Sequence, residues 1–106
     1  MKFIEVKELV KTNKFVTLRS DSEELFEAVL VKEELKQLNA CLSKIFGQPF
    51  FPPEKNIYLA NKIVENYGGI AAGQTFYYLE DDLIVAMLWP WQDGVNITFK
   101  LISKKD

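Results

Sequence analysis

An unbroken apolar run from Leu83 to Trp89 constrains this chain more than any other stretch of its sequence. The run is too short to cross a membrane, and Asp81-Asp82 and Pro90 bound it on either side. A short apolar run between turn residues is typical of a strand that is buried on both faces. We therefore expect it to be the middle strand of a sheet.

Turn residues on both sides of this run predict a three-stranded meander at the C-terminal end. Asp81-Asp82 joins the run to a strand over 74–79, and Asp93-Gly94 joins it to a strand over 95–102. The last strand alternates between apolar and polar residues, so we expect one of its faces to be core and the other to be wet or functional.

The register of the meander follows if both loops are two-residue turns, because opposed residues then point to the same face. One face, which we expect to be ordinary core, carries Tyr77, Leu79, Ile84, Ala86, Leu88, Phe99 and Leu101. The other face carries Phe76, Tyr78, Val85, Met87, Trp89, Trp91, Asn96, Thr98 and Lys100. This second face is a large aromatic surface with a polar margin, and we expect another part of the chain, a second subunit or an apolar ligand to cover it.

The first part of the chain predicts two further strands. Phe15–Arg19 and Leu25–Val31 are rich in β-branched and aromatic residues, and the polar residues between them suit a hairpin loop. The alternative for the second segment is one long helix over 22–46, because Ser22 followed by two acidic residues resembles a helix start. Residues 3–11 predict a short leading helix, although a strand fits them nearly as well.

Two longer helices are expected in the middle of the chain. Residues 32–46 carry one apolar stripe at helical spacing and end at Gly47. A proline-rich connector follows, in which we expect Phe50 and Phe51 to plug the edge of the sheet. A second helix begins at Pro53 and ends at a double glycine.

Together these elements predict a single α+β domain over residues 1–106 with the order β-β-α-α-β-β-β. Its antiparallel sheet has about five strands, the two main helices cover one face of the sheet, and the meander closes the chain.

Composition excludes several functions. The chain has no histidine, which removes the usual general base and the commonest ligand of catalytic zinc. A net charge of −2 without a basic patch argues against a nucleic-acid partner. We expect Cys41, the one cysteine, to be a small core residue, and we expect no cofactor. With no apolar leader and no membrane span, we expect a cytoplasmic protein.

The acidic turn Glu80-Asp81-Asp82 is a weak candidate for a cation site or for a pair of catalytic carboxylates. An enzyme of this type would use Tyr77 or Tyr78 as its acid. A solvated turn is the more common role for such a sequence.

The tryptophans of Trp89-Pro90-Trp91 carry our main functional hypothesis, a non-catalytic binding protein. Contiguous exposed aromatic residues mark interaction sites, so a second copy of the chain or a small apolar molecule would cover them. The alternative is that the N-terminal segment folds over them. A third possibility is an adaptor that offers its sheet edge or its proline-rich connector to another protein. The candidate ligand or interface residues are Phe76, Tyr78, Met87, Trp89, Trp91, Phe50 and Phe51.

Overall fold

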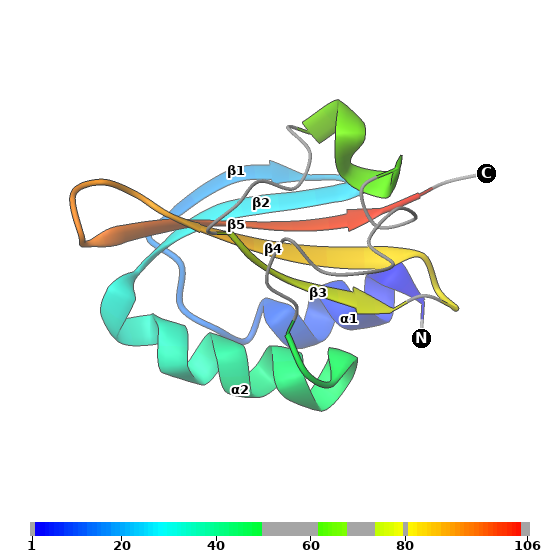
Figure 1. Ribbon diagram of the computed structural model, residues 1–106, viewed down its shortest axis with the longest axis horizontal. Coiled ribbons are helices and arrows are strands. Elements are labelled where there is room, and N and C mark those ends of the chain that lie inside the picture. Colours follow the sequence, from blue (N-terminus) through cyan, green and yellow to red (C-terminus); the bar gives the residue numbers. More distant parts are fainter. Residues whose placement is uncertain (1, 50–61, 68–73, 80, 105–106) are drawn as a thin grey trace.

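The computed structural model describes residues 2–49, 62–67, 74–79 and 81–104, which form one antiparallel sheet with helices on both sides (Figure 1). The order of the strands in the sheet is β1-β2-β5-β4-β3. Their bounds are β1 (Thr17–Asp21), β2 (Leu25–Val31), β3 (Thr75–Leu79), β4 (Ile84–Pro90) and β5 (Asn96–Ser103). The C-terminal strand β5 therefore lies at the centre of the sheet, between β2 and β4.

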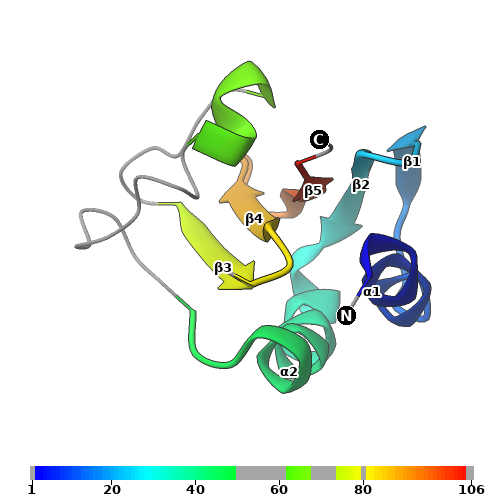
Figure 2. The ribbon, with the colours of Figure 1, turned by 90° about the vertical axis from the view of Figure 1, so that its right-hand side faces the viewer.

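Helices α1 (Phe3–Val10) and α2 (Leu35–Phe46) cover one face of the sheet, which we call the helix face (Figure 2). A short 3-10 turn, η1 (Lys32–Glu34), leads from β2 into α2, which ends at Gly47 with a φ of 86°. Residues 62–67, which include the 3-10 turn η2 (Glu65–Tyr67), lie on the opposite face. None of the helices in the described segments is long and apolar enough to cross a membrane.

The predicted α+β fold and the C-terminal meander are confirmed. The register is also confirmed, because Tyr77 pairs with Ala86 and Leu88 pairs with Phe99. Strand β4 begins one residue later than expected, since Leu83 belongs to the turn and has a φ of 53°. Local sequence rules therefore located the meander and its faces correctly.

Three details of the predicted arrangement differ in the structure. Residues 25–31, for which a long helix over 22–46 was the alternative prediction, form strand β2, so the helical alternative is wrong. The first strand begins at Thr17, because Phe15 turns into the core against Phe26, at 5.5 Å between ring centroids. The helix that shares a face with α2 is α1, whereas residues 62–67 cover the other face. The predicted helix start at Pro53 lies outside the described residues.

The core of the helix face joins both helices to four strands. Fully buried side chains from α1, α2, β2 and β5, such as Val6, Leu42, Leu30 and Phe99, pack together there. Burial of each such side chain stabilises the fold by about 1.5–3 kcal/mol. An ion pair between Lys7 and Asp21, at 2.8 Å, ties α1 to the end of β1.

Candidate functional site: the tryptophan end of the aromatic face

The sheet face opposite α1 and α2, which we call the aromatic face, has a covered half. Ile63 and Val64 pack on Phe76, Val85 and Met87 in a second buried cluster. Phe76 and Met87 are only 1% and 2% exposed, so the chain itself already covers them. They are therefore not accessible to an outside partner in this conformation.

Three further candidate residues lie beside this covered half or outside the described segments. Tyr78 is half-buried and packs against the same cluster. Phe50 and Phe51 lie outside the described residues. The accessible part of the predicted site is thus its tryptophan end.

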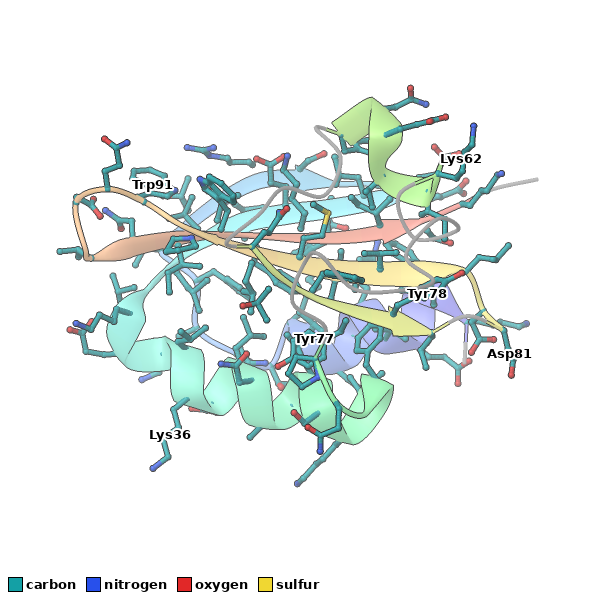
Figure 3. All side chains as sticks on the ribbon, in the orientation of Figure 1. Lys36, Lys62, Tyr77, Tyr78, Asp81 and Trp91 are labelled. Atoms are coloured by element: carbon teal, nitrogen blue, oxygen red, sulfur yellow. The ribbon has the colours of Figure 1, made fainter. Side chains whose placement is uncertain are left out.

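Trp89 and Trp91 lie at the other end of the aromatic face and are 45% and 36% exposed. Figure 3 shows Trp91 at this end of the sheet. The Trp91 indole Nε1 donates a hydrogen bond to Thr98 Oγ1 on β5, at 2.7 Å. The Arg19 guanidinium of β1 lies over the Trp91 ring, 5.6 Å from its centroid. Arg19 also pairs with Glu27 of β2, at 3.5 Å. We call these five residues the tryptophan patch.

The local sequence explains why these side chains meet. Residues 18–20 of β1 contain a β-bulge opposite β2, and the extra residue, Arg19, points toward the aromatic face. Trp89 pairs with Thr98 across β4 and β5, and Thr98 pairs in turn with Val29 of β2. Strands β4, β5, β2 and β1 therefore lie side by side, with Trp89 on β4 and Arg19 on β1.

The β4–β5 loop holds the end of the patch in place. Asp93 Oδ1 accepts hydrogen bonds from the backbone N–H groups of Val95, at 2.8 Å, and Asn96, at 3.0 Å. These bonds lower the pKa of Asp93 below its ordinary value, because they favour the charged carboxylate. Gly94 has a φ of 70°, which a residue with a side chain rarely adopts. The backbone N–H of Trp91 donates to Asn96 O, at 2.9 Å, and closes the hairpin.

Sequence reasoning located both tryptophans on the aromatic face but missed Arg19 and Glu27. Arg19 comes from the opposite edge of the sheet, and only the strand order brings it close. The sequence shows only that the two residues carry opposite charges on the two strands of the predicted first hairpin, in which they are not directly opposed. The idea that the N-terminal segment covers the tryptophans is wrong, since α1 packs on the helix face.

Tyr77 does not share a site with the acidic turn. Asp81 and Asp82 are exposed at the end of the sheet, and Glu80 lies outside the described residues. Tyr77 points toward α2 and donates to Asn39 Oδ1, at 3.0 Å (Figure 3). Burial raises the pKa of the Tyr77 hydroxyl above its ordinary value. A buried, bonded phenol of this kind is not placed to serve Asp81 as an acid.

The two acidic loops lie at the same end of the sheet, on either side of β5. Ser103 N–H donates to Glu24 O, at 2.9 Å, and Lys104 N–H donates to Leu83 O, at 3.2 Å. Within the described segments, no group of three acidic or cysteine side chains could hold a metal ion.

Comparison with known proteins gives no match: no family model fits the chain, and no curated protein or solved structure is significantly similar to it.

Proposed function

We propose that this protein is a non-catalytic binding protein that pairs with a second copy of itself through the tryptophan patch. The observation that carries the proposal is the exposure of two tryptophans, one of which is already held by Thr98 and Arg19. Tryptophan and arginine are the side chains that contribute most often to binding hot spots. Because Trp91 is fixed before binding, little conformational entropy is lost when a partner covers it.

A second copy is favoured as the partner by the composition of the patch. A two-fold symmetric interface uses the same patch on both subunits, so the patch must be complementary to itself. The tryptophan patch contains a cation, Arg19, an anion, Glu27, and apolar rings within one sheet face. Each copy can therefore offer its aromatic rings to the other and place opposite charges across the interface.

The test is native mass determination over a concentration series, with tryptophan emission recorded on the same samples. Trp89 and Trp91 are the two tryptophans of the chain, so the emission reports on this patch alone. We expect a dimer at high concentration whose blue-shifted emission moves to the red as it dissociates on dilution.

A charge at Trp89 is the sharpest perturbation of the proposed interface. Trp89→Glu should weaken dimerisation by about thirtyfold or more, the usual effect of losing a hot-spot side chain worth about 2 kcal/mol. Ile4→Glu is the matched control, because Ile4 is also an exposed apolar residue, at 52%, but lies on α1 on the other face of the sheet. A monomer at every concentration, or a dimer that tolerates Trp89→Glu, would contradict the proposal.

A further inference from the structure

A pocket of about 520 Å³ opens between α1 and α2, on the side of the molecule away from the tryptophan patch. Its volume falls within the ~300–1,000 Å³ range of pockets that bind small molecules. The lining residues are Leu9, Thr12, Asn13, Gln37, Ala40, Cys41, Lys44 and Ile45. The two helices run antiparallel there, so the end of α1 faces the middle and end of α2 (Figure 1).

The pocket combines an apolar wall with one cation. Leu9, Ala40 and Ile45 supply the apolar surface, and Leu9 is 43% exposed. Lys44 is the charged residue of this lining, and its ammonium group has no ion pair with any residue in the described segments. No acidic side chain of those segments joins it in the lining. The charge of the pocket therefore favours an anionic group beside Lys44.

A second, independent feature of the pocket is the buried side-chain amide of Asn13. Asn13 is only 8% exposed and its Nδ2 donates to Val10 O, at 2.9 Å. Because a carbonyl oxygen can only accept, this bond fixes the amide orientation and turns Oδ1 away from Val10. Asn13 Oδ1 is buried and has no hydrogen-bond partner within the described part of the chain. A buried acceptor without a donor destabilises the fold, and a donor on a bound molecule would offset this cost.

We infer that this pocket binds a small amphipathic anion that carries one N–H or O–H donor. Its acidic group lies beside Lys44, and its apolar body covers Leu9 and Ala40. Its donor bonds to Asn13 Oδ1 once the Asn13 side chain turns this buried atom toward the pocket. The site is on the opposite side of the sheet from the tryptophan patch, so it stands independently of the proposed dimer.

Anilinonaphthalene sulfonate is a suitable probe, because it has a sulfonate, apolar rings and an N–H donor. Cys41 gives a second readout at the same place. We predicted a core position for this thiol, but it is half-buried in the pocket wall, with Sγ 3.7 Å from Leu9 O. It is the single cysteine of the chain, so alkylation by iodoacetamide reports on this pocket alone.

We expect saturable dye binding that slows alkylation of Cys41 in proportion to occupancy. Lys44→Gln should weaken binding by about tenfold or more, as expected for the loss of a charge-assisted hydrogen bond. Lys36→Gln is the matched control, since Lys36 lies on the same helix and points away from the molecule (Figure 3). Ala40→Phe should abolish binding by filling the pocket from an exposed helix position, with circular dichroism confirming the fold.

Three results obtained with bound dye would overturn the inference. These are dye binding that leaves Cys41 alkylation unchanged, equal affinity in wild type and Lys44→Gln, and binding that is lost in Trp89→Glu instead, which would place the dye on the tryptophan patch. Absence of dye binding at millimolar concentration would also overturn it. An N-methylated dye, which lacks the donor, should bind about tenfold more weakly, and equal affinity would overturn the role of Asn13.

Discussion

Single residues connect parts of this protein that are distant in sequence, and Asp21 is the clearest case. Its carboxylate accepts from Lys7 Nζ, at 2.8 Å, and from Lys11 Nζ, at 2.9 Å. Lys7 is itself buried and also donates to Ser22 O, at 3.0 Å. These contacts lower the pKa of Asp21, with the hydrogen bond from Lys7 as the largest cause, and raise the pKa of Lys11.

The pH dependence of folding should report this cluster. Because the pKa of Asp21 is lower in the folded protein, its contribution to stability is present above the ordinary aspartate value of about 3.9 and is lost as the pH falls below that value. We expect Asp21→Asn to lower the free energy of unfolding by about 1 kcal/mol at neutral pH. Urea unfolding of wild type and variant between neutral pH and about pH 2 measures the difference.

The difference in the free energy of unfolding between wild type and Asp21→Asn should shrink as the pH falls through the acidic range. Asp81→Asn is the control, since Asp81 lies exposed on the turn at the same end of the sheet. If the difference in the free energy of unfolding between wild type and Asp21→Asn stays constant at every pH, the assigned ion pairs of Asp21 are contradicted.

At the scale of elements, the β4–β5 hairpin decides how the tryptophan patch is presented. The two strands carry Trp89 and Thr98 as direct partners, and the loop between them is held by Asp93. Asp93 Oδ2 also accepts from Asn96 Nδ2, at 2.7 Å, so one side chain makes three bonds within the loop. Order in this loop should therefore depend on a single residue.

Asp93→Ala removes all three hydrogen bonds and should loosen the hairpin end. We expect faster hydrogen exchange at the amides of Val95 and Asn96, which lose their partner. Asp93→Asn should give an intermediate effect, because its amide oxygen can still accept from both backbone groups. Gln92→Ala, a change at the exposed neighbouring residue, is the control, and exchange rates equal to this control would refute the role of Asp93.

At the scale of the whole molecule, a central sheet is covered on both faces. The helix face is closed by α1 and α2, and part of the aromatic face is closed by residues 62–67. Both clusters share the same strands, since β4 contributes Ala86 to one and Val85 to the other. We therefore predict that the chain unfolds as one cooperative unit, as a single domain should.

One substitution in each layer tests this prediction. Leu42→Ala should lower the free energy of unfolding by about 3 kcal/mol and Val64→Ala by about 2 kcal/mol, because both side chains are fully buried. Circular dichroism in urea should show that both variants shift the midpoint of one transition. A separate early transition in Val64→Ala, or an unchanged midpoint, would mean that the buried cluster on the aromatic face does not fold together with the core of the helix face.

The candidate site shows how far local sequence rules reach. The alternation of side chains and the turn residues at Asp81-Asp82 and Asp93-Gly94 predicted that Trp89 and Trp91 share a face. The same rules could not show that Phe76 and Met87 on that face are covered by residues 62–67. An amphipathic segment has an apolar stripe that fits either face of a sheet, so its sequence does not select one.

The sequence by itself determined the strands of the meander, their register and the faces of their side chains, because a period of two residues and a short turn act between neighbours. The tertiary structure alone decided which helices cover which face, that Arg19 meets Trp91, and that Lys44 and Asn13 line one pocket. These contacts join residues far apart along the chain, and they depend on the order of the strands and on the packing of all the layers at once.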